Sequence, residues 1–176
     1  MMRGALELFT EQGFEKTTAL EVAQRAGVTE RTFYRHFTDK REVLFSASGD
    51  LQDAIIAAID SAPASQDALG MVVAAMEIGV APLEGNRPYS LARARVITEN
   101  ASLQERELLK LHTLAGAASV ALRARGVAPL AADVAAETAV TMFKIGFETW
   151  IADDSSGTFA QCIRRAFTEL RSLAQG

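Results

Sequence analysis

The chain has 176 residues, 49% of them apolar, with 18 Lys and Arg against 22 Asp and Glu and a net charge of −4. This length fits one average domain, or a small domain joined to a larger one, and leaves ample material for a core. The single cysteine excludes an intramolecular disulfide, and no secretory signal or membrane-spanning stretch is expected, so we expect a cytoplasmic protein with no membrane partner.

Two short helices are predicted at the N-terminus. Apolar residues with a helical period begin at Met2, and Gly13 is placed to end that helix in a left-handed conformation. Thr18 and Glu21 have the spacing of a capping box, in which each side chain bonds the other's backbone. A second helix therefore begins there and runs to Ala26.

A third helix follows a tight turn. Gly27 supplies the turn, and Thr29 can cap a helix that reaches Phe37. Small residues before the glycine permit a close approach of the two helices, while Phe33 and Phe37 bury the inner face of the third. Two short helices joined in this way form a helix-turn-helix, whose second helix enters the major groove of DNA.

The remaining chain is also predicted to be helical. Asp39 and Glu42 begin a fourth helix that continues to about Asp60 as a stem. The stretch "APLEGNRP", residues 81–88, carries the strongest loop signal in the chain. The other predicted helices are 66–80, 90–100, 103–125, 130–152 and 158–174.

Positive charge is concentrated around the turn and the third helix. Residues 22–41 contain five Lys and Arg against two acids, whereas the rest of the chain contains 13 against 20. Such a patch indicates a local anionic partner, although a solvated helix face would have the same composition. The outward side chains of the third helix can reach base edges, and others nearby can reach phosphates. The base candidates are Glu30, Arg31, Thr32 and Arg35, and the phosphate candidates are Tyr34, His36, Lys40 and the helix start at Thr18.

The ungapped stretch "ALELFTEQGFEKTTALEVAQRAGVTERTFYRHFTDKREVLF", residues 5–45, resembles the DNA-binding domain of the TetR family of transcriptional regulators. The resemblance implies the phosphate roles given above and adds Thr29 to the residues that select bases. Position 31 is often glycine or alanine in the family, so Arg31 either bonds a guanine through O6 and N7 or reaches only a phosphate. Family members usually carry a basic arm before the first helix, and this arm is either absent here or lies upstream of Met1.

The resemblance also implies a homodimer that reads a palindromic operator, a duplex DNA site. The last two long helices would form an intermolecular four-helix bundle, with a purely internal core as the alternative. Both helices carry apolar faces suited to this bundle. The predicted interface residues are Thr138, Thr141, Met142, Ile145, Phe159, Ile163, Phe167 and Leu170.

A small-molecule effector is implied as well, bound inside the helical body. Large, adaptable apolar side chains are candidates for its pocket, although each is more commonly a core residue. His112 could anchor a ligand or be a satisfied core or rim histidine, and Arg95 could receive an acid or pair with Glu99 on the surface. Residues 93–104 are similar to regulators with an acyl-CoA-like regulatory domain, which favours a fatty or acyl ligand. The pocket candidates are Met71, Met76, Arg95, His112, Phe143, Phe147 and Trp150.

We therefore predict an all-α protein with a three-helix DNA-binding domain at residues 1–45 and a helical effector-binding and dimerisation domain at residues 46–176. Its predicted function is that of a ligand-responsive regulator, in the family's usual mode a repressor. An enzyme is disfavoured because two histidines and one cysteine provide no nucleophile–base pair, and no metal or cofactor is expected. A helical carrier that binds an apolar ligand without DNA remains the alternative.

Overall fold

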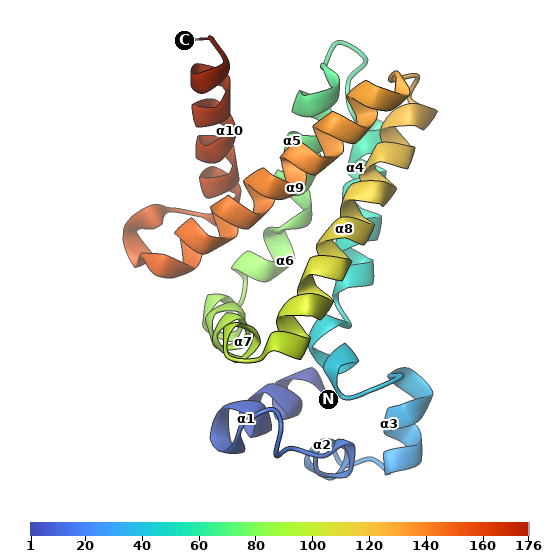
Figure 1. Cartoon of the computed structure of the whole chain (residues 1–176), viewed down its shortest axis with the longest axis vertical. Helices are drawn as coiled ribbons and strands as arrows, with labels where there is room; N and C mark the ends of the chain where they lie inside the picture. The colour runs from blue at the N-terminus through green and yellow to red at the C-terminus, as the bar shows by residue number, and fades with distance from the viewer. Residues whose placement is uncertain (176) are drawn as a thin grey trace. The chain divides into compact units, whose positions relative to one another are not determined.

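The computed structural model describes residues 1–175 as helices and connecting turns, without a strand in that range (Figure 1). The prediction of an all-α fold is confirmed. The elements are α1 (Met2–Gln12), α2 (Ala19–Arg25), α3 (Glu30–His36), the 3₁₀ helix η1 (Arg41–Phe45), α4 (Ser48–Ser61), α5 (Ala68–Gly79), α6 (Ala81–Glu84), α7 (Arg87–Thr98), α8 (Ala101–Ala124), α9 (Pro129–Ala152), the 3₁₀ helix η2 (Asp154–Ser156) and α10 (Phe159–Gln175).

Packing divides the chain into two compact units. The first unit joins residues 1–48 to residues 88–109, and the second joins residues 49–87 to the chain from Lys110 onward. The single helix α8 therefore contributes its N-terminal part to the first unit and its remainder to the second. The predicted boundary between residues 45 and 46 separates a DNA-binding function from an effector-binding and dimerisation function. Packing does not test that separation, which stays a prediction.

The first unit is held by one apolar core. Phe33 of α3 and the α2 residues Val22 and Ala23 have no exposed surface. Residues from α7 and the start of α8 complete this core, namely Val96, Ile97 and Leu103, which are at most 5% exposed. The helix-turn-helix thus depends on chain that follows it by some fifty residues or more.

Local hydrogen bonds set the helix starts that the sequence predicts. The Thr18 hydroxyl accepts from the Glu21 amide at 3.2 Å, and the Glu21 carboxylate accepts from the Thr18 amide at 2.7 Å. The Thr29 hydroxyl caps α3 by accepting from the Thr32 amide at 3.2 Å. Between these helices Gly27 has φ +70°, a conformation that costs a residue with a Cβ atom. Both predicted caps and the predicted turn are confirmed.

The single fourth helix predicted over residues 39–60 is wrong, because η1 and α4 are separate elements. Asp39, two residues before η1, accepts a hydrogen bond from the Arg41 amide at 2.7 Å. After η1, Ser46 and Ser48 donate side-chain hydrogen bonds to carbonyls three residues earlier, at 3.1 and 2.6 Å. These bonds compete with the α-helical pattern and break the helix between η1 and α4.

The predicted loop at residues 81–88 is also wrong for most of its length. Residues 81–84 form α6, and α7 begins at Arg87. The two prolines of this stretch lie in the first turns of these helices, where their missing N–H groups are not required. Only Gly85 and Asn86 remain outside a helix.

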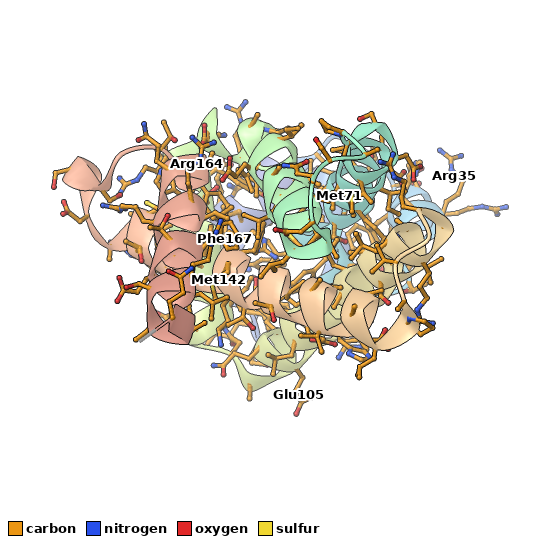
Figure 2. The ribbon with its side chains drawn as sticks, turned by 90° about the horizontal axis from the view of Figure 1, so that it is seen from above. Arg35, Met71, Glu105, Met142, Arg164 and Phe167 are labelled. Carbon is orange, nitrogen blue, oxygen red and sulfur yellow. The ribbon has the colours of Figure 1, made fainter. Side chains whose placement is uncertain are left out.

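In the second unit α9 packs against α5 and α10. Gly146 of α9 permits the closest of these approaches, since a Cβ atom added there would lie 2.8 Å from the Ile163 amide nitrogen of α10. Phe159 and Ile163 at the start of α10 have no exposed surface as a result. Figure 2 shows Phe167 and Met142 where α10 and α9 meet.

Candidate nucleic-acid interface

Helix α3 has one buried and one exposed face. Phe33 is fully buried and packs with Phe37, their ring centres being 5.1 Å apart. On the other face Arg31, Tyr34 and Arg35 are exposed, Tyr34 to 54%, and Arg35 extends away from the helix (Figure 2). The Tyr34 ring stands edge-on to Phe33, with centres 5.4 Å apart. The core therefore fixes the orientation of the face that the sequence predicts to contact DNA.

Two cations of the basic patch are paired within the protein. Arg25 bonds Glu11 at 2.9 Å and also lies 3.5 Å from Glu7. Its hydrogen bond holds the pKa of Glu11 below the usual range of a carboxyl group. Arg41 bonds Asp39 at 2.7 Å, and this bond likewise lowers the pKa of Asp39. Neither arginine adds much uncompensated charge to the surface.

Lys40 is bonded to the backbone instead of standing free. Its ammonium group donates to the carbonyls of Phe14, Glu15 and Thr17 at 2.7, 3.2 and 3.0 Å. It also lies 4.2 Å from the centre of the Phe14 ring. An ammonium group has three donors, and all three are used here. Lys40 therefore fixes the connection between α1 and α2, and in this structure it has no donor left for the phosphate predicted as its partner.

The threonine and glutamate side chains predicted to contact DNA differ in whether they are already hydrogen-bonded within the protein. Thr18 is engaged in its capping box, where its amide is the main cause that lowers the pKa of Glu21. The Thr29 and Thr32 hydroxyls lie 3.0 Å apart and bond each other. Glu30 and His36 are exposed at opposite ends of α3.

Arg31 and Arg35 are the cations of this patch that remain available to pair with an anionic group of another molecule. Among residues 1–175, no carboxylate partner is described for either of them. Arg35 lies 3.5 Å from the Nε2 atom of His36, a weak contact that leaves most of its donors available. An exposed pair of guanidinium groups beside a tyrosine is suited to binding a phosphate backbone or base edges.

Sequence reasoning missed the residues that support this face from α7 and α8. Arg93 donates to the Leu44 carbonyl at 2.9 Å and to Glu107 at 3.0 Å. Arg106 forms an ion pair with Glu42 of η1, and both side chains are partly buried. These contacts link residues far apart in the sequence, so no local spacing could have indicated them.

The aromatic residues predicted to line an effector pocket pack on one another. Phe159 stacks on Trp150 with ring centres 5.2 Å apart, and lies 5.1 Å from Phe143 and 5.5 Å from Phe147. This cluster fills the end of the second unit. The pocket role of these residues stays a prediction.

The two polar pocket candidates lie on the surface. The His112 side chain is 77% exposed and lies 3.9 Å from Glu137, so it is neither a core histidine nor an anchor within the core. Arg95 is exposed in the first unit, whereas the other candidates belong to the second unit. No ion pair between Arg95 and Glu99 is described within residues 1–175, and both side chains are exposed.

An open groove of about 420 Å³ crosses α9 in the second unit. Met71 and Met76 are buried in the core and do not line it. None of the other five pocket candidates lines it either. Its walls are Asp67, Ala68, Leu69, Ala131, Val134, Ala135, Thr138, Phe167 and Arg171.

Three predicted dimer residues are covered by the protomer's own core. Phe159 and Ile163 are fully buried, and Met142 is 6% exposed, because the close approach at Gly146 seats the start of α10 on α9. In the single protomer they have little surface left for a second copy, and their role at an interface stays a prediction. The amphipathic stripe at the start of α10 is used within the protomer.

The other predicted dimer residues are accessible. Thr141 and Ile145 are exposed, and Thr138, Phe167 and Leu170 are partly buried.

Among the described residues 1–175, no cluster of three or more metal-ligating side chains is present. No single helix in that range is long and apolar enough to cross a membrane. Taken together, the segments Ala68–Glu84 and Arg87–Thr98 are long and apolar enough, as a bent pair and by length and composition only.

Comparison with known proteins agrees with this geometry. Residues 2–47 match the family described as bacterial regulatory proteins, tetR family. The HTH-type transcriptional regulator TcmR of Streptomyces glaucescens is 41% identical over 69 residues, which cover 39% of this chain but only 30% of that relative.

Solved structures share the fold of the whole chain. One, described as a TetR-family transcriptional regulator from Syntrophomonas wolfei, has 19% identity and a TM-score of 0.66, with 99% of this chain and 93% of that chain covered. Another so described, from Mesorhizobium loti, has 19% identity and a TM-score of 0.59, with 97% and 91% covered. The matched family and proteins are all described as regulators. The N-terminal residues 2–47 are thus similar to the tetR family of bacterial regulatory proteins, and the whole chain has the fold of these solved structures.

Proposed function

We propose that the chain is a cytoplasmic repressor that binds a palindromic operator as a homodimer and releases it when a small apolar or acyl-type effector binds. The observation that carries the proposal is the exposed face of α3, where Arg31, Tyr34 and Arg35 stand over a buried aromatic core. One helix-turn-helix reads only a few base pairs, so specific binding requires a second copy.

The exposed side of α9 supports the homodimer. Val134, Thr138, Thr141 and Ile145 follow one another at helical spacing, and Val134 and Ile145 are 59% and 43% exposed. The groove beside Thr138 continues this surface towards α10. Exposed apolar side chains along one helix face are suited to association with a second copy.

The composition of the second unit supports an apolar effector. Its core consists almost entirely of apolar side chains, including Met71 and Met76, which have no branch and can repack around a ligand. A space opened among these residues would accept a hydrocarbon chain without leaving polar groups unpaired. To cause release, the effector must bind the DNA-incompetent conformation more tightly than the competent one.

The test is a mobility-shift assay of the full chain with duplex fragments from upstream of its own gene. We expect specific, salt-dependent binding, which Tyr34→Ala weakens on all duplexes alike. Ile145→Arg should convert the dimer to a monomer in analytical ultracentrifugation and abolish specific binding. Val120→Arg is the matched control, because Val120 is also an exposed apolar residue, at 65%, but lies on α8.

Two results would contradict the proposal. A wild-type chain that shifts no duplex at low salt but binds fatty acids would be a carrier. A chain that remains monomeric at the concentrations that saturate DNA would exclude the two-copy mode of reading.

A further inference from the structure

We infer that Arg31 and Arg35 act as a pair that reads two guanines in each half of the operator. The inference rests on the proposed function, since it requires that α3 enter a DNA groove. It goes beyond that function by stating which bases the groove must present, and it assigns base reading to two residues.

The first step is the elimination of the neighbouring cations. Arg25 and Arg41 are bonded to carboxylates at 2.9 and 2.7 Å, and Lys40 is bonded to three carbonyls. Using any of these on DNA would break bonds within the protein. Arg31 and Arg35 can bind DNA without such a loss, because no carboxylate partner is described for them in residues 1–175.

The second step is the position of the pair on α3. Residues four apart lie on the same face of a helix, so Arg31 and Arg35 are neighbours on its exposed side. Their Cα atoms are separated by about 6 Å along the axis, which is close to two base-pair steps of about 3.4 Å. A helix lying in the groove can therefore bring the two guanidinium groups to two nearby base pairs of one half-site.

The third step is the chemistry of the bases. A guanidinium group has donors only, and guanine presents two acceptors, O6 and N7, at the spacing of its fork. The hydroxyls of Thr29 and Thr32, by contrast, bond each other at 3.0 Å. The capacity of α3 for bidentate reading of guanine is thus concentrated in its two arginines.

The experiment is selection of binding duplexes from a random pool by the full-length protein, followed by affinity measurements. We expect a palindromic consensus with two guanines, adjacent or one base apart, in each half-site. Replacing either guanine should weaken wild-type binding by roughly 5- to 150-fold. Arg31→Gln should remove the preference at one guanine and Arg35→Gln at the other. Arg25→Gln is the matched control, since it removes the same charge and should leave both preferences intact.

A second measurement tests the bidentate contact itself. Substitution of 7-deazaguanine, which lacks N7, should weaken wild-type binding at each position but have no further effect on the variant whose arginine reads that position. The inference is overturned if the consensus half-sites lack guanine, if Arg25→Gln alters the preference equally, or if 7-deazaguanine is tolerated by the wild type. If no duplex is enriched at all, the proposed function fails and the inference fails with it.

Discussion

Replacing Lys40 with Met separates a structural role from a DNA contact. Met keeps the apolar stem of the side chain but removes the ammonium group, which leaves the Phe14, Glu15 and Thr17 carbonyls without their donor. A hydrogen bond to a charged group contributes about 1.5–3 kcal/mol. Water can replace the bond to the exposed Glu15 carbonyl, and the lower value applies to the other two because Lys40 is only partly buried. We expect a loss of about 3 kcal/mol, or a melting temperature lower by about 6–12 °C.

Thermal unfolding by circular dichroism measures the loss, and hydrogen exchange of residues 14–18 locates it. Lys16→Met is the control, because Lys16 is exposed and no bond to it is described in residues 1–175. It should leave the melting temperature unchanged. The reasoning is refuted if Lys40→Met melts and exchanges like the wild type while its affinity for DNA falls as in Tyr34→Ala. That result would restore the phosphate role predicted from the sequence.

Three further outcomes are expected. Gly146→Ala should destabilise the second unit by about 1–2 kcal/mol, because the Cβ atom of the alanine would meet the main chain of α10. This cost should exceed the gain from the better helix propensity of alanine, and tryptophan fluorescence in urea measures the difference. A double-mutant cycle of Glu42→Gln and Arg106→Gln should give a coupling energy of about 1 kcal/mol in thermal unfolding, since both side chains are partly buried. The lowered pKa of Glu21 means that its bond to Thr18 is fully stabilising above pH 4.5 and is lost as the pH falls further, so Glu21→Gln should flatten the acid side of the stability profile.

The sequence predicted the helix-turn-helix well because its signals are local. The capping box at Thr18, the cap at Thr29 and the turn at Gly27 each depend on residues within three positions of one another. The alternation of Phe33 with polar neighbours on a short helix also determined which face of α3 would be buried.

Predictions that depended on distant contacts were less accurate. The stripe that begins with Phe159 and Ile163 has the pattern of an association surface, but the pattern does not say which helix covers it. The small residue that decides this, Gly146, lies on another element. In the same way, nothing near Lys40 in the sequence indicates that its partners lie around residue 15.

The discontinuity of the first unit limits how this protein can be re-engineered. A chimaera that grafted only residues 1–48 onto a foreign regulator would lack Val96, Ile97 and Leu103, which complete the apolar core of this unit. Exchange of DNA specificity between such proteins should therefore transplant residues 88–109 together with the N-terminal segment. Alternatively, it should be confined to the solvent-facing positions of α3.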